Sequence, residues 1–206
     1  MAKKVLYNAK DADMGAIVAN IESVYNVVKD ANNANDLLAW YGIARSWCAD
    51  VALDFGLETR QVAGIVAVFS PQLSWEKNKF TAREFMRRYV AGESFAGLMA
   101  YKANVAKACR IMDGEAPESV IGGRKVSSFF NNIMGDTSTV TVDRHALHIA
   151  LYGVDGADEK SGSITPTDKL YSMVEIAYRT VAENVGIAPM ALQSITWSFK
   201  AQNGEA

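Results

Sequence analysis

Apolar residues recur every three or four positions through most of this chain, and this spacing constrains the fold more than any other feature of the sequence. Between Asp13 and Lys29 they fall on a single helical face. The same period predicts further helices over residues 36–55, 62–69, 74–90, 101–112, 124–134, 143–151, 167–185 and 189–201. Thr59 is the predicted cap of the helix over 62–69. Only residues 137–142 have an extended pattern, and there is no convincing strand pair. The predicted fold class is therefore all-α.

The length and composition of the chain fit one helical domain. It has 206 residues, of which 50% are hydrophobic and 21% are charged, and these are ordinary values for a globular protein. Such a length supports one substantial core or a two-lobed domain with a cleft. Residues 153–167 are rich in turn formers and predict an exposed loop. We expect a single all-helical domain over residues 1–206.

The sequence has no feature of a membrane, secreted or metal-binding protein. No apolar run approaches the roughly 18–20 residues that span a bilayer, and the first residues lack the apolar stretch of a signal peptide. Cys48 and Cys109 lie in apolar helical contexts and are expected to be free, buried thiols. Two cysteines and two histidines leave no four-ligand zinc or iron–sulfur site. We expect a cytoplasmic monomer with no metal and no cofactor.

Charge is unevenly distributed along the chain. The net charge is −2, whereas nucleic-acid binders usually carry a basic excess. Residues 76–125, however, contain ten Lys and Arg against six Asp and Glu, a net charge of +4. A basic stretch of this kind suits contact with phosphates, although the solvated face of a helix has the same composition.

Two short segments contain candidate functional residues, and each also has a purely structural interpretation. Gly122 and Gly123 precede a helix, where backbone amides can meet an anion. Taken alone, they are better explained as a turn between two helices. Asp143 stands between a short apolar stretch and an apolar helix, which is the position of a helix cap. A cap carboxylate near a cleft can also do electrostatic or general-base work.

The spacing of these segments resembles that of a known enzyme family. Gly123-Arg124-Lys125 is followed after 17 residues by Asp143-Arg144-His145, which is similar to the signature of the helix-hairpin-helix DNA glycosylases of the endonuclease III type. Further segments resemble the family in the same order: Ser70-Pro71-Gln72-Leu73-Ser74 with Asn78-Lys79-Phe80-Thr81-Ala82, then residues 102–111, and then Gly114-Glu115-Ala116-Pro117-Glu118. The resemblance covers residues 62–150 and implies a hairpin at 121–125.

The resemblance implies a bilobal helical bundle with a central cleft that binds DNA. Lys125 would be the amine that attacks C1′ of a flipped-out nucleotide and forms a Schiff base. Asp143 would stabilise the positive charge that develops on the sugar. Gln72 would fill the gap left in the duplex. The other expected DNA contacts are Gly122, Gly123, Arg124, Lys77 and Lys79. The implied function is a DNA N-glycosylase with AP lyase activity on a damaged or modified base.

Departures from the family pattern keep two other functions open. Ile121 occupies the position of the first hairpin glycine, and the helix before it is reduced to residues 117–120. These departures suit a divergent bacteriophage-type relative that modifies pyrimidines in DNA as a transferase. A non-catalytic DNA-binding module is the third hypothesis, because a fold does not fix a function. The presence of both Lys125 and Asp143 argues against this third hypothesis.

Several aromatic and histidine residues are weaker candidates. His145 and His148 share one helix face and are interpreted as structural residues. Three tryptophans could stack on a flipped base, although their apolar stripes are typical of a core: Trp40, Trp47 and Trp197. A pocket on the last two helices could be lined by three polar side chains: Tyr171, Tyr178 and Gln193.

Overall fold

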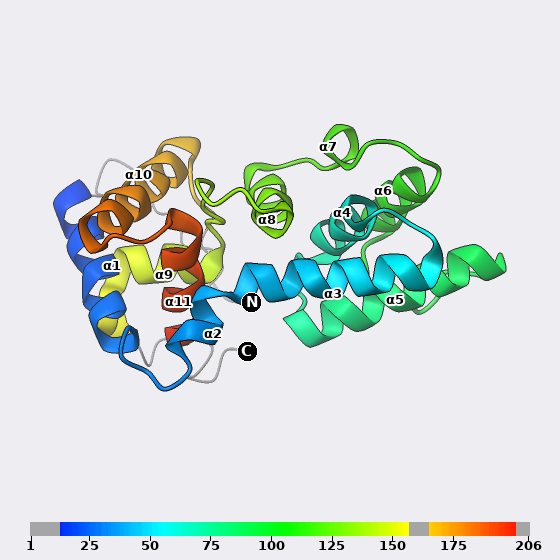
Figure 1. Cartoon of the computed structure of the whole chain (residues 1–206). Coiled ribbons are helices and arrows are strands. Elements are labelled where there is room, and N and C mark those ends of the chain that lie inside the picture. The colour runs from blue at the N-terminus through cyan, green and yellow to red at the C-terminus, as the bar shows by residue number, and fades with distance from the viewer. Residues whose placement is uncertain (1–12, 157–164, 201–206) are drawn as a thin grey trace. The chain divides into compact units, whose positions relative to one another are not determined.

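The computed structural model describes residues 13–156 and 165–200. Within these ranges the chain forms eleven α-helices and one 3-10 turn, and no strand (Figure 1). The all-α fold class expected from the helical period is confirmed. Residues 137–142 lie outside any helix and pair with no strand in the described part of the chain.

The chain divides into two compact units. Unit 1 combines residues 1–40 with residues 136–206, and unit 2 is the continuous segment 41–135. The segment that resembles the glycosylases therefore spans both units, because residues 62–135 belong to unit 2 and residues 136–150 to unit 1.

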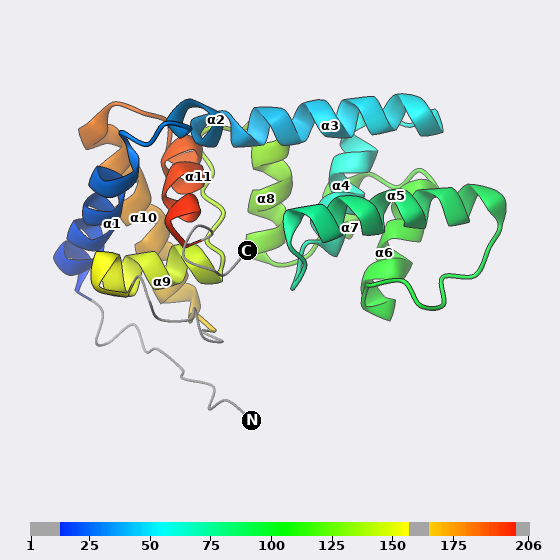
Figure 2. The same cartoon turned by 90° about the horizontal axis from the view of Figure 1, so that it is seen from below.

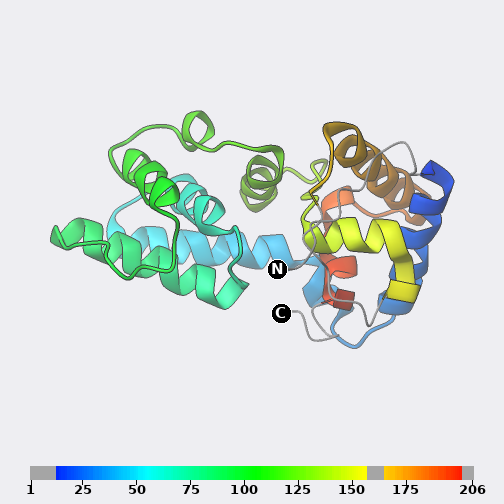
Figure 3. The same cartoon turned by 180° about the vertical axis from the view of Figure 1, so that it is seen from behind.

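Unit 1 is built around its first helix. The helix α1 (Met14–Val28) packs against α9 (Arg144–Tyr152), α10 (Asp168–Val185) and α11 (Pro189–Lys200). Two short elements complete the unit, α2 (Ala34–Leu38) against α11 and the 3-10 turn η1 (Gly153–Gly156) after α9. Figure 3 shows α9, in yellow, crossing next to these helices. Their apolar faces form one core that includes the fully buried Ile21, Val24, Ile149, Leu170 and Val174.

Unit 2 is built around α4 (Thr59–Phe69). This helix contacts α5 (Trp75–Ala91), α6 (Lys102–Met112), α7 (Pro117–Val120) and α8 (Arg124–Met134), which gather around it in Figure 2. Every residue from Val62 to Phe69 is buried, so α4 has neighbours on all its sides. A helix that is apolar all round, as α4 is, needs such a central place. The remaining helix of this segment is α3 (Trp40–Phe55).

The structure corrects three details of the helical prediction. The helix expected over 36–55 is interrupted at Ala39, which separates α2 from α3. The buried stripe of α3 is Tyr41, Ala44, Cys48, Val51 and Ala52, so the tryptophans Trp40 and Trp47 are only half-buried. The cap of α4 is Glu58 rather than Thr59, and its backbone N–H donates to Gln61 Oε1 at 3.0 Å, as in a capping box.

Both cysteines are free thiols, but they differ in burial. Cys48 is buried in α3, where burial raises the pKa of its thiol to about 12. Cys109, expected to be buried, is only half-buried in α6. The Cys48 thiol, which burial keeps protonated, is chemically inert. Among residues 13–156 and 165–200, no helix is long and apolar enough to cross a lipid bilayer.

Candidate functional site

The turn between α7 and α8 exposes a helix N-terminus. Gly123, the N-cap of α8, has φ 87, a conformation that glycine adopts without strain, and as a glycine it has no side chain with which to cap the helix. The Gly123 carbonyl already accepts the Ser127 amide at 3.1 Å. Both glycines are exposed, and a Cβ at Gly122 would lie 3.4 Å from Lys107 Nζ. A helix N-terminus beside cations is a suitable setting for an anionic group.

Lys125 lies in the first turn of α8 and is half-buried. Its Nζ donates a hydrogen bond to Ser70 Oγ at 3.1 Å and lies 5.6 Å from the centre of the Phe129 ring. Ser70 is the C-cap of α4, so the packing of α8 on α4 brings these two residues together across 55 positions of sequence. Two segments that resemble the glycosylases, 70–74 and 121–125, therefore meet inside unit 2.

Gln72 has a strained backbone. Its φ of 68 is the only positive φ of a non-glycine residue in the described part of the chain. It occupies the third position of the turn from Ser70 to Leu73, with Pro71 second, and the Leu73 amide donates to the Ser70 carbonyl at 3.4 Å. A turn of this kind favours glycine at its third position. Strain that a glycine would relieve is a reason to look for a role of the side chain.

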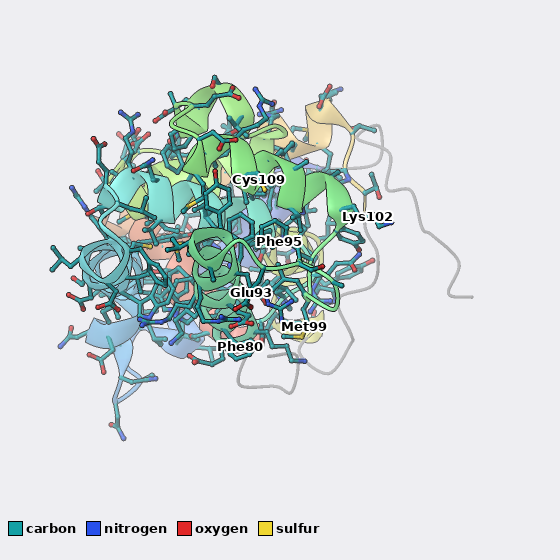
Figure 4. The ribbon with its side chains drawn as sticks, turned by 90° about the vertical axis from the view of Figure 1, so that its right-hand side faces the viewer. Phe80, Glu93, Phe95, Met99, Lys102 and Cys109 are labelled. Atoms are coloured by element: carbon teal, nitrogen blue, oxygen red, sulfur yellow. The ribbon has the colours of Figure 1, made fainter. Side chains whose placement is uncertain are left out.

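The exposed Gln72 side chain is held by Tyr101, whose hydroxyl donates to Gln72 Oε1. Tyr101 ends the loop that connects α5 with α6. This loop is anchored by Arg88, which donates to the carbonyls of Ser94 and Ala96 at 3.1 and 2.8 Å. Phe95, which is labelled in Figure 4, fixes the loop from the apolar side. Its ring stacks on that of Phe85, with ring centroids 5.0 Å apart. No pattern in the sequence indicates this role of Tyr101.

Several of the basic residues between positions 76 and 125 form ion pairs with neighbouring carboxylates. Among them are Lys79, Arg83, Arg87, Arg88 and Arg110. Of the two lysines expected to contact DNA, Lys79 pairs with Glu76 at 2.8 Å and lies over the Trp75 ring, whereas Lys77 is exposed and forms no ion pair with a described residue. The basic surplus of this stretch is therefore only partly available to phosphates.

Asp143 caps α9 in unit 1. Its Oδ1 accepts the backbone amides of His145 and Ala146 at 3.0 and 2.9 Å, which is the arrangement expected of a helix cap. The carboxylate remains half-buried. The negative charge of Asp143 also acts on the buried Tyr178 of the same unit. Burial is the largest cause that raises the pKa of the Tyr178 hydroxyl; the hydrogen bond of Tyr178 with Thr196 opposes this rise, and the charge of Asp143 adds to the rise.

The other candidates of unit 1 are largely internal. His145 and His148 are buried, and the His145 ring meets Trp197 edge to face at 5.7 Å. Tyr171, Tyr178 and Gln193 are buried as well, and Trp197 is half-buried. No group of three or more His, Cys, Asp and Glu side chains that could hold a metal ion occurs in the described ranges.

The expected site residues thus divide between the units. Lys125, Arg124, Gln72 and the remaining DNA-contact candidates belong to unit 2, and Asp143 belongs to unit 1. Sequence reasoning gave no role to Ser70 and did not count Lys107 among the DNA contacts. Ser70 stood inside a segment that resembles the family, but only the packing of α8 on α4 relates it to Lys125.

The chain belongs to DUF7178, a family of unknown function whose model matches residues 3–204. No curated protein and no solved structure matches it. The description of the family names no activity.

Proposed function

We propose that this protein is a DNA N-glycosylase with AP lyase activity, which acts on a damaged or modified base flipped out of the duplex. The observation that carries the proposal is the setting of Lys125. It is a half-buried amine in the first turn of α8, held on Ser70 directly after Gly122 and Gly123. A nucleophilic amine needs partial desolvation, and a phosphate bound at the adjacent turn would bring a sugar within its reach.

In the proposed reaction, the lone pair of the neutral Lys125 amine attacks C1′ and the bond from C1′ to the base breaks. The base leaves with the bonding electrons and takes up the proton that the nitrogen loses. The C1′–O4′ bond then breaks, O4′ gains a proton, and a Schiff base joins C1′ to Nζ. Loss of a proton from C2′ allows the C3′–O3′ bond to break, and the phosphate leaves, which cuts the strand.

Asp143 would oppose the positive charge that develops on the sugar as the base leaves. A carboxylate can do this from a helix cap, because its two bonds to the backbone fix its position. Gln72 would fill the vacated place in the duplex. Its exposure and its strained backbone support this role, since a structural turn would be more stable with glycine at that position.

The charge of unit 2 also supports a nucleic-acid substrate. Residues 41–135 carry twelve Lys and Arg against nine Asp and Glu, a net charge of +3, and the rest of the chain carries −5. Lys107 and Arg124 stand beside the exposed glycine turn, where they would favour a phosphate.

The test is Schiff-base trapping. The full chain is incubated with labelled duplexes that carry different damaged or modified bases or an abasic site, and borohydride is added. Hydride transfer to the C1′=Nζ bond yields a stable crosslink, which is read on a denaturing gel. Lys125→Ala should abolish the crosslink. Lys169→Ala is the matched control, because Lys169 is also the second residue of a helix and lies on α10 of unit 1.

A second variant, Asp143→Asn, tests the role of the carboxylate, and the pattern of crosslinking separates the lyase from its alternatives. The amide keeps the helix cap but removes the charge, so the rate of crosslinking should fall while the fold persists. Absence of any crosslink, with turnover that depends on Asp143 and needs a modified base and a second substrate, would favour the base-modifying transferase. The single-turn α7 and the extended Ile121 are the features that suit that alternative. Binding to DNA with no reaction would favour the non-catalytic module.

A further inference from the structure

We propose that Ser70 is a positioning residue for Lys125: its hydroxyl accepts one N–H of the amine and thereby directs the nitrogen lone pair to the substrate. The inference rests on the proposed function, because it concerns the same amine. It assigns to the end of α4 a role in the chemistry of α8.

The hydroxyl of Ser70 is a rigid acceptor. Ser70 is 8% exposed, and its backbone is fixed on both sides, since its amide donates to Ala67 O at 3.2 Å and its carbonyl accepts the Leu73 amide at 3.4 Å. The following Pro71 restricts the chain further. Nearby, Asn78 Nδ2 donates to Val66 O at 3.0 Å and ties α5 to the same part of α4.

The lysine, in contrast, has a long and flexible side chain. Four methylene groups separate Nζ from the backbone of α8, so the amine can sample many positions unless a partner orders it. The Phe129 ring limits this freedom on one side, and the bond of 3.1 Å to Ser70 limits it on the other. Ordering a nucleophile before attack accelerates reactions strongly, because only a small part of its rotamers points at the reacting carbon.

The bond remains useful after the ammonium has lost its proton. A neutral amine keeps two N–H bonds and gains one lone pair. If Ser70 accepts one of these N–H bonds, the lone pair points away from α4. The hydroxyl itself gains and loses no proton in this step. The hydrogen bond between Lys125 and Ser70 also has a disadvantage for the reaction. It stabilises the charged ammonium and so raises the pH at which the amine becomes neutral.

Two further cationic side chains lie near this end of α8. Arg124 precedes Lys125, and Lys107 of α6 lies near Gly122. The helix packed on this side, α4, contributes one charged residue, Arg60, which is paired with Glu118. Because the hydrogen bond to Ser70 stabilises the charged ammonium, removal of the Ser70 hydroxyl should shift the titration of Lys125 to lower pH. The same removal should disorder the amine.

Two measurements on four variants test the inference. The first is the rate of borohydride trapping on an abasic-site duplex as a function of pH. The second needs no DNA: lysines are dimethylated with ¹³C-formaldehyde, and the Lys125 signal, assigned by its loss in Lys125→Arg, is titrated by NMR. The variants are Ser70→Ala, Ser70→Cys, Ser70→Thr and the control Ser74→Ala. Ser74 lies in the same loop and its hydroxyl caps no helix amide.

We expect Ser70→Ala to lower the plateau rate of trapping about tenfold to a hundredfold and to shift both pH curves to lower pH. Ser70→Cys should behave in the same way, because sulfur is a weak acceptor of nearly the same size; it keeps the test decisive if the alanine variant folds poorly. Ser70→Thr should restore both readouts, and Ser74→Ala should change neither.

The possible failures are distinct. If the wild-type protein crosslinks and Ser70→Ala crosslinks at the same rate with an unchanged pH profile, the positioning role is wrong and the proposed function stands. If the wild-type protein crosslinks to no duplex, the proposed function is wrong, and the inference falls with it even if the NMR titration still reports the contact. A loss of rate that Ser70→Thr does not restore, with an unshifted NMR titration, also overturns the inference.

Discussion

Gly64 of α4 and Pro117 of α7 are in direct contact: a Cβ on Gly64 would lie 2.7 Å from Pro117 Cβ and 2.9 Å from Cγ. Side chains never approach this closely, so α7 can pack on α4 only because residue 64 has no side chain. The contact matters for the site, because α7 leads directly into the glycine turn before α8.

Gly64→Ala should therefore destabilise the protein although alanine is the better helix former. Overpacking costs about 1–3 kcal/mol, whereas the helix propensity returns about 1 kcal/mol. The control is Gly42→Ala on α3, where a Cβ would meet no atom within 4 Å. That variant should raise the free energy of unfolding by up to about 1 kcal/mol. Urea unfolding of both variants checks this, and equal stabilisation by both would contradict the contact.

We expect the Gln72→Gly variant of the protein to be more stable than the Gln72→Ala variant. Both substitutions remove the amide and its bond to Tyr101, but only glycine relieves the positive φ. Relief of such strain is worth about 1 kcal/mol or more, which exceeds the entropic penalty of glycine of about 0.5–1 kcal/mol. Thermal and urea unfolding measure the difference. If alanine proves the more stable variant, the backbone at Gln72 is not strained in solution.

The same two variants probe the role of the Gln72 side chain. If the amide fills the gap in the duplex, both should lower the rate of crosslinking to a duplex that carries a damaged base, and to a similar degree. Their rates on single-stranded DNA, where no gap has to be filled, should stay close to the wild-type rate. An equal loss on both substrates would point to a defect in the Lys125 site instead.

Asp143→Ala and Asp143→Asn should separate stability from activity. Alanine loses the bonds to the amides of His145 and Ala146 and should cost about 1 kcal/mol, whereas asparagine caps nearly as well. Both variants should lose most of the crosslinking rate, because both remove the charge. Thr167→Ala, which removes the cap bond to the Leu170 amide in α10 of the same unit, should lose stability but keep activity. Full activity of Asp143→Asn would limit Asp143 to a structural cap.

The acid stability of unit 2 should depend on Glu84. Hydrogen bonds from Arg87 and Arg88, at 3.0 and 2.6 Å, lower the pKa of Glu84 from 4.5 to about 2. A carboxyl group whose pKa is lower in the folded protein stabilises it above its unfolded pKa, and this contribution is lost as the pH falls from 4.5 to 2.

Glu84→Gln should accordingly lower the thermal midpoint at pH 7, and the difference from the wild-type protein should shrink as the pH falls below 4.5. The carboxylate is close to the surface, so high salt should reduce the effect. Thermal unfolding between pH 7 and pH 2.5 measures the difference. A difference that stays constant over this range would show that the ion pairs do not couple to folding.

Secondary structure followed closely from local patterns. The helix over 124–134 was predicted to the residue, since a glycine pair precedes it and Gly135 ends it. Asp143 was recognised as a cap for the same local reason. The break at Ala39 and the burial of Tyr41 in place of Trp40 were missed, because both depend on which neighbours α3 meets and not on its own period.

The sequence by itself determined that this chain is helical, where most of its helices end, and which residues have chemistry to offer. It could do so because helical periodicity, caps and glycine stops act over a few residues. Only the tertiary structure decided that Lys125 rests on Ser70, that Gln72 is strained and held by Tyr101, and that several of the basic residues between 76 and 125 are already paired. Each of these contacts joins segments, or selects among side-chain partners, through packing that no local pattern encodes.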